Sequence, residues 1–112
     1  MNSPLPALII VWIIVYFLKN KDKTEYKTVV VDSTEVPVIE AALKRIGGKA
    51  IVNSINLEDG EEKLDQICGL CQKYGAAVIA LTIDEEGMAK TANRKLEIAK
   101  RIYNLAVGKH GI

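Results

Sequence analysis

Two polar residues, Asp32 and Asn53, stand where ligand chemistry is expected in this sequence. Asp32 follows the apolar run 29–31, and Asn53 follows the apolar run 50–52. In α/β proteins, side chains at the carboxyl ends of parallel strands line ligand sites. A carboxylate accepts two N–H groups, and an amide both donates and accepts. The pair therefore suits a heterocycle that carries adjacent donors and acceptors.

Each of these residues also has a local structural role open to it. Asp32 is a suitable N-cap for a following helix, and Asn53 is a common turn residue. A third acid, Asp84, closes another apolar run and opens the acidic stretch 84–86, which suits either a ligand or a solvated loop. We expect Ser33, Ser54 and Asp84 to form the edge of the same pocket.

The two cysteines, Cys68 and Cys71, have the spacing of a redox or metal motif. A redox role needs the first cysteine near a helix N-terminus, where its pKa falls, but both residues lie within a predicted helix on its apolar side. A zinc site needs a second ligand pair, and His110, placed in an exposed tail, does not provide one. Core packing is the favoured interpretation, so no zinc site is expected.

The composition restricts the function classes further. The chain has 112 residues, of which 49% are hydrophobic, and its net charge is +1. No basic stretch combines with aromatic residues, which argues against a nucleic acid partner. Two cysteines are too few for a disulfide scaffold, so we expect a reduced, cytoplasmic protein.

The sequence predicts an alternating β-α-β-α-β-α order from residue 28 onward, with short connections. Strands are expected over 28–31, 50–54 and 76–83, because these runs are apolar and rich in β-branched residues. Helices are expected after Pro37, after the acids at 59–62, and over 91–107. The last helix is expected to bury Leu96, Ala99, Ile102, Tyr103 and Ala106. Such units build a parallel sheet with right-handed crossovers.

The N-terminal segment, residues 1–27, differs from the rest, and we divide the chain into 1–27 and 28–112. Residues 7–18 are apolar without interruption, and four lysines follow them. A spanning helix needs about 20 apolar residues, so this run is short. The segment is expected to form an apolar helix that contacts a membrane, and the lysines would then keep its C-terminal side in the cytoplasm. The alternatives are a buried strand or helix, or an N-terminus that is only attached to the domain.

Four motifs in order resemble one family. They are Val-Val-Asp32-Ser-Thr-Glu35, Ile-Val-Asn53-Ser-Ile-Asn56, Tyr74-Gly-Ala-Ala-Val-Ile and Asp84-Glu-Glu-Gly87-Met-Ala. They closely resemble the pterin-binding domain of cobalamin-dependent methionine synthase over residues 29–112, and are similar to corrinoid methyltetrahydrofolate methyltransferases and, more distantly, to dihydropteroate synthase. The resemblance implies a (β/α)8 TIM barrel in which Asp32 and Asn53 hydrogen-bond the pterin ring of methyltetrahydrofolate.

The resemblance further implies a methyltransferase of methionine biosynthesis. The methyl group would pass to cobalamin on a separate module and then to homocysteine, so folate and other methionine synthase modules are the expected partners. Only about three of the eight βα units are present, and the later-strand residues of the pocket have no counterpart here. We therefore expect a truncated, partial barrel that is inactive alone. The alternatives are a membrane-tethered α/β interaction module and a redox protein that uses Cys68 and Cys71.

Overall fold

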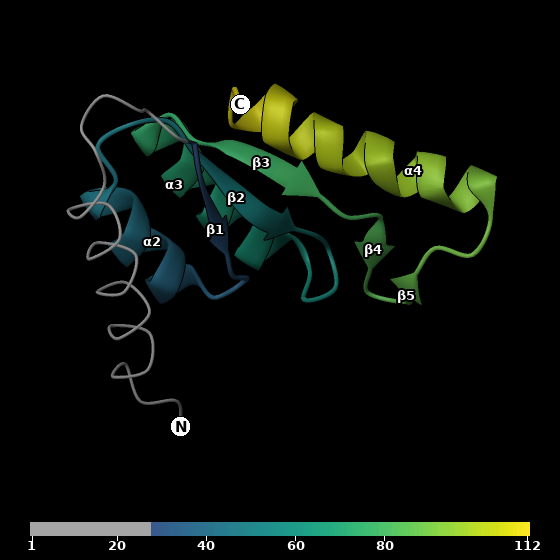
Figure 1. The fold of residues 1–112 in the computed structure, drawn as a ribbon. Coiled ribbons are helices and arrows are strands. Elements are labelled where there is room, and N and C mark those ends of the chain that lie inside the picture. The colour runs from purple at the N-terminus through teal and green to yellow at the C-terminus, as the bar shows by residue number, and fades with distance from the viewer. Residues whose placement is uncertain (1–27) are drawn as a thin grey trace.

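The structure, a computed structural model, describes residues 28–112 (Figure 1). Three strands alternate with three helices, as predicted. The elements are β1 (Val29–Asp32), α2 (Val36–Arg45), β2 (Ala50–Ile55), α3 (Glu61–Tyr74), β3 (Ala77–Ala80) and α4 (Ala92–Tyr103). The apolar helix expected in segment 1–27 and the membrane contact expected at 7–18 both lie outside the described residues.

The three long strands form a parallel sheet in the order β1-β2-β3. Val31 pairs in register with Val52, and Val52 pairs with Val78. This arrangement of parallel neighbours joined by helical crossovers confirms the α/β class and fits three consecutive units of a barrel.

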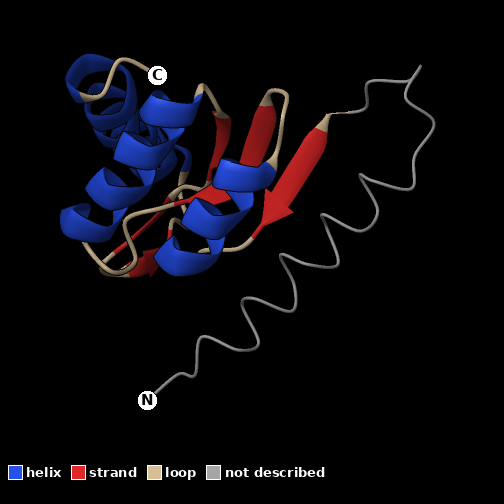
Figure 2. Ribbon diagram, turned by 90° about the vertical axis from the view of Figure 1, so that its left-hand side faces the viewer, coloured by secondary structure: helices blue, strands red, loops and turns tan. Residues whose placement is uncertain are grey.

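The helices cover one face of the sheet (Figure 2). Val31 and Val52 point into the core with the apolar sides of α2 and α3, and all of them belong to one buried cluster. Side chains alternate along a strand, so the neighbours of Val31 and Val52 point to the opposite face of the sheet. On that face Val30 of β1 is 47% exposed and Ile79 of β3 is 41% exposed. The part of the chain that the structure describes therefore leaves the second face of the sheet uncovered.

Local sequence signals explain where the helices begin and end. Pro37 lies in the first turn of α2, where its missing N–H costs nothing. Glu61 and Glu62 open α3 at the positive end of its dipole. Gly75 ends α3 with a φ of 70°, a left-handed backbone conformation that residues other than glycine rarely adopt.

The third strand is shorter than the sequence predicts. We expected it over 76–83, but it ends at Ala80, and the chain then turns into a small antiparallel hairpin of β4 (Ile83–Asp84) and β5 (Gly87–Met88). Gly87 has a φ of 105°, which suits such a tight turn. The apolar residues on both sides of the turn conceal the break in the sequence, because hydrophobicity alone does not distinguish a strand from the turn that follows it.

The helix α4 is rotated relative to the prediction. Its buried residues are Ile98 and Ile102, followed by Ala106 in the π-helical segment η1 (Asn104–Lys109). Leu96 is 54% exposed, and Ala99 and Tyr103 are also exposed, so the predicted burial of these three residues is wrong. Leu96 lies two positions from Ile98, which places it on the opposite side of a helix with 3.6 residues per turn.

Candidate functional site

The structure brings Asp32 and Asn53 together. They are register partners at the ends of the adjacent strands β1 and β2. Neighbouring strands lie about 4.8 Å apart, so two side chains paired in this way stand side by side. The backbone N–H of Ser33 donates to the carbonyl oxygen of Asn53 at 2.9 Å, which fixes the two strand ends relative to each other. Both side chains belong to the uncovered face, where Asp32 is exposed and Asn53 is half-buried.

An apolar residue continues this row on the third strand. Asn53 pairs in register with Ile79 of β3, so the row reads Asp32, Asn53, Ile79 across the uncovered face. Directly below it lies a second row of Val30, Ile51 and Ala77. Sequence reasoning missed Ile79, although the two-residue period of the strand, counted from Val78, would have placed it on this face.

The two serines that follow these residues lie at the same strand ends. Ser33 is half-buried, and its hydroxyl oxygen accepts a hydrogen bond from the N–H of Glu35 at 3.0 Å, which shapes the turn into α2. Ser54 is buried in β2. Both residues therefore flank the Asp32–Asn53 pair, and Ser33 stabilises the turn that leads from Asp32 into α2.

Asp84 does not lie at the end of β3, because the chain turns into the β4–β5 hairpin before it. It belongs to the β4–β5 hairpin and is only 4% exposed. One carboxylate oxygen accepts a hydrogen bond from the N–H of Glu86 at 3.0 Å, and the other pairs with the guanidinium of Arg94. The carboxylate thus joins the hairpin to α4. Sequence reasoning missed Arg94, because no local pattern connects residues ten positions apart across a hairpin.

A second arginine of α4 extends these connections. Arg101 pairs with Glu85 of the hairpin turn at 2.9 Å and with Glu61 at the start of α3 at 3.0 Å. The hydrogen bonds from Arg101 lower the pKa of Glu85 to about 2. The two arginines together hold the hairpin, α3 and α4 in a fixed arrangement around the carboxyl edge of the sheet.

The cysteines are core residues, as the sequence predicts. Cys68 and Cys71 are fully buried free thiols on α3. Burial raises the pKa of Cys68 to about 12 and that of Cys71 to about 11. A reactive cysteine needs a lowered pKa and access to solvent, so the geometry does not support the redox interpretation.

His110 does not occupy an exposed tail, which corrects the sequence prediction. Its ring nitrogen Nε2 lies 2.7 Å from a carboxylate oxygen of Asp65 on α3. Lys109 approaches the other oxygen of Asp65 at 2.8 Å, and these two contacts lower the pKa of the Asp65 carboxyl. The C-terminal turn is thereby attached to α3, a contact between residues too distant in sequence for a local pattern to indicate.

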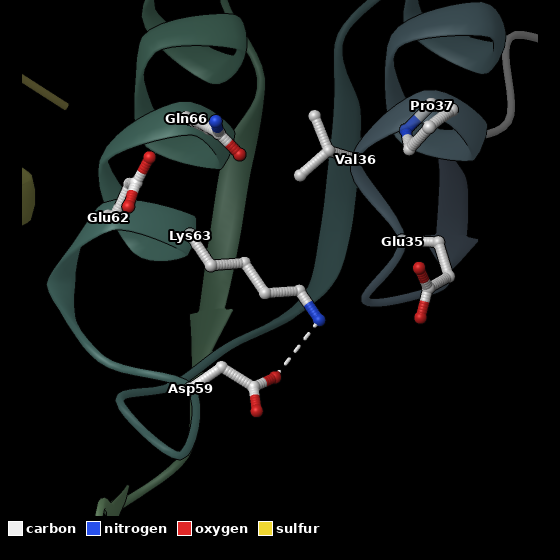
Figure 3. A pocket seen from close by; sticks show the side chains of 7 residues that line it. All are labelled: Glu35, Val36, Pro37, Asp59, Glu62, Lys63 and Gln66. Atoms are coloured by element: carbon white, nitrogen blue, oxygen red, sulfur yellow. Dashed lines mark hydrogen bonds and ion pairs between the residues drawn. The ribbon is translucent and has the colours of Figure 1, made fainter.

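One cavity among the described residues has a lining that includes neither Asp32 nor Asn53. It has a volume of about 320 Å³ and opens between the first turns of α2 and α3 (Figure 3). Its lining is Glu35, Val36, Pro37, Asp59, Glu62, Lys63 and Gln66. The only ammonium group of the lining, on Lys63, pairs with Asp59 at 3.2 Å. Three carboxylates around one neutralised cation disfavour an anionic ligand, so we prefer the Asp32–Asn53 row as the site.

Residues 28–112 contain neither a metal-binding cluster nor a membrane-spanning helix. No group of three or more His, Cys, Asp or Glu side chains in this range is placed to hold a metal ion. No helix within the same range is long and apolar enough to cross a bilayer.

Known proteins resemble the chain over most of its length. The sequence pattern of the family described as pterin binding enzyme matches residues 12–112, a range that begins within segment 1–27. The methionine synthase of Mycobacterium tuberculosis is 46% identical over 87 residues, and that of Mycobacterium leprae is 42% identical over 87 residues. Each alignment covers 75% of this chain and 7% of the relative. These matches confirm the resemblance to the pterin-binding domain of methionine synthase, and the chain belongs to the pterin-binding enzyme family.

Proposed function

We propose that the chain binds the pterin ring of methyltetrahydrofolate on the row formed by Asp32, Asn53 and Ile79. The observation that carries this proposal is the register pairing of Asp32 with Asn53 at the ends of adjacent parallel strands. Both side chains stand on the uncovered face, where a flat ring can reach them. Family membership supplies the ligand class, because the matching family is one of pterin binding enzymes.

The chemistry of the pair suits this ligand. A pterin presents an N–H and an amino group side by side on one edge of its ring, and the Asp32 carboxylate can accept both. A bidentate, charge-assisted contact of this kind is among the stronger hydrogen-bonding arrangements. The Asn53 amide can donate to a ring acceptor and accept from a ring donor. Ile79 adds an apolar surface beside the polar pair for the face of the ring.

The residues around the row form the edge of the proposed pocket. Ser33 and Ser54 follow the two ligand-binding residues directly. Asp84 acts from a distance, since its carboxylate holds the β4–β5 hairpin against Arg94. The hairpin lies beyond the carboxyl end of β3 (Figure 1), and the proposal gives Asp84 the role of fixing one border of the ligand site.

We further propose that this binding serves methyl transfer of the methionine synthase type. A methyl group leaves N5 of the folate only when that nitrogen is protonated or hydrogen-bonded, because a neutral amine is a poor leaving group. Asp32 and Asn53 would bind and orient the ring for this step. Cobalamin on a separate module supplies the methyl acceptor, and we assign no residue of 28–112 to it.

Calorimetry with methyltetrahydrofolate tests the site. Losing a hydrogen bond to a charged group costs about 1.5–3 kcal/mol, so Asp32→Asn should weaken binding about tenfold or more. Asn53→Ala should weaken it as well. Asp59→Asn is the matched control, because Asp59 is an exposed acid in the cavity between α2 and α3, and we expect it to leave the affinity unchanged. Circular dichroism verifies that each variant is folded, and binding that survives the Asp32 and Asn53 substitutions would contradict the assignment.

A further inference from the structure

The one charged side chain that is buried within residues 28–112 belongs to Asp84, and it pairs with Arg94 of α4. A buried carboxylate without its partner is costly, so this ion pair restricts where the β4–β5 hairpin can lie. The guanidinium of Arg94 also lies 3.3 Å from a carboxylate oxygen of Glu86 in the same hairpin. Arg94 therefore holds the hairpin against α4 through two acids.

The hairpin in turn contacts the segment 56–58, which leads from β2 toward α3. The backbone N–H of Leu57 donates to the carbonyl oxygen of Ile83 at 2.8 Å, and the N–H of Leu81 donates to that of Ile55 at 2.9 Å. These two hydrogen bonds continue the contact between β2 and the third strand beyond the end of β3. Leu57 is fully buried, so the hairpin fixes this segment from within the core.

The segment 56–58 directly follows the strand that carries Asn53. The side-chain oxygen of Asn56 accepts a hydrogen bond from the N–H of Glu58 at 2.9 Å, which closes a tight turn around Leu57. Such a turn has little freedom of its own, and packed interiors transmit a displacement. A shift of the hairpin at Leu57 therefore reaches the end of β2, where Asn53 lies.

Arg101 of α4 forms a second, weaker link between the same parts. It pairs with Glu61, the first residue of α3, and with Glu85 in the hairpin turn. The side chains of both acids are about half exposed, and exposed ion pairs contribute little because water and salt screen them. The buried pair of Arg94 with Asp84 should therefore have the larger effect on where the hairpin lies.

We propose that Arg94 is a positioning residue for the pterin site. Through Asp84 it fixes the hairpin, and the hairpin fixes Leu57. The segment 56–58 then holds the end of β2 where the Asn53 amide can meet a bound ring. Arg94 itself does not touch the ligand, and α4 acts in this way on a site formed by β1 and β2. The effect on ligand binding rests on the proposed function, whereas the control of segment 56–58 by Arg94 does not.

Hydrogen exchange followed by NMR on the full 112-residue chain, without folate, tests the control of the segment. Arg94→Gln should accelerate exchange of the Leu57 and Leu81 amides about 2- to 30-fold more than that of the Ala76 amide. The Ala76 N–H donates to Cys71 at the C-terminal end of α3, away from the hairpin. Equal acceleration of all three amides would mean that Arg94 contributes to global stability alone, and would overturn the proposal.

Three further variants complete this measurement. Arg94→Lys keeps the charge and should restore most of the protection of the Leu57 amide. Arg45→Gln is the matched control, because the Arg45 guanidinium donates to the carbonyl oxygen of Ala41 in its own helix, and it should leave the Leu57 amide unchanged. Asp84→Asn combined with Arg94→Gln removes the buried charge together with its partner, so it stays informative where Arg94→Gln alone unfolds the chain. Wild-type exchange at Leu57 in this double variant would contradict the proposal.

Calorimetry with methyltetrahydrofolate tests the consequence at the site. A folded Arg94 variant should bind about 2- to 30-fold more weakly than the wild type, and Arg45→Gln should bind as the wild type does. Adding Asn53→Ala to Arg94→Gln should weaken binding by less than the product of the two single effects, because Arg94 acts through Asn53. Unchanged affinity in the folded Arg94 variants would overturn the proposal. A wild-type chain that binds no folate would instead refute the proposed function, and the exchange rates would still decide whether Arg94 controls the segment.

Discussion

Two leucine-to-alanine substitutions test how the helices pack on the sheet. Leu64 in α3 is 1% exposed and belongs to the core, whereas Leu96 in α4 is 54% exposed. Sequence periodicity placed both residues on buried faces, and only the structure separates them. The chemical change is identical at the two positions, so any difference in the free energy of unfolding reports burial alone.

The expected costs follow from the area removed from water. Leu→Ala deletes three carbon groups, each worth about 0.8 kcal/mol when buried, which gives about 2.4 kcal/mol of transfer free energy at Leu64. A cavity term raises the total into the range of about 2.7–5 kcal/mol. At Leu96 less than half of the side chain is buried. The same calculation gives about 1 kcal/mol there, with no cavity left behind.

Urea unfolding monitored by circular dichroism measures both values. The experiment is run at low protein concentration, because association would stabilise the folded state. We expect Leu64→Ala to destabilise the chain at least twice as much as Leu96→Ala. The free energy of unfolding of a typical domain is only about 5–15 kcal/mol, so the loss at Leu64 is a large fraction of it. Equal destabilisation at the two positions would refute the reasoning, since it would mean that Leu96 is covered.

Three further predictions follow from the side-chain contacts. Cys68 and Cys71 should resist a thiol reagent at about pH 8 until the chain unfolds, because their pKa values of about 12 and about 11 keep them protonated, and a reaction-rate measurement detects this. The Glu85 carboxyl should titrate, as followed by NMR, near its pKa of about 2. Because this pKa is lowered from the ordinary value of 4.5, the ion pair stabilises the fold fully above pH 4.5, and the stabilisation is lost as the pH falls through about 2. Arg101→Gln should return the titration midpoint of Glu85 toward 4.5. Arg94→Gln should lower the urea midpoint more than Arg101→Gln, since only Arg94 pairs with a buried carboxylate.

Short-range patterns in the sequence were sufficient to predict the order of the elements. Each strand is a continuous apolar run, and Pro37, Glu61 and Gly75 mark the helix ends through backbone chemistry that acts within one turn. The end of β3 at Ala80 was not predictable in this way. The hairpin that replaces its last residues depends on pairing between Ile83 and Met88, which local hydrophobicity does not report.

The candidate site was predictable in part for the same reason. Asp32 and Asn53 both end apolar runs, and the parallel order of the strands brings such positions to one edge. Asp84 also ends an apolar run, but the chain turns before reaching it, so its carboxylate meets Arg94. The orientation of α4 decides that contact, and the amphipathic pattern of α4 is ambiguous because exposed and buried apolar residues alternate along it.

The position of Asp32 and Asn53 connects ligand binding to the covering of the sheet. They stand on the face that residues 28–112 leave open, beside Val30 and Ile79, whose exposure forgoes hydrophobic stabilisation. A partner that covered Val30 and Ile79 would also exclude water from the space around Asp32 and Asn53. The lower local dielectric would strengthen their hydrogen bonds to a bound ring. Binding linkage is reciprocal, so a partner that raises the affinity for folate must itself bind more tightly, by the same factor, when folate is present. The uncovered apolar face and the pterin site are therefore thermodynamically coupled through any partner that covers both.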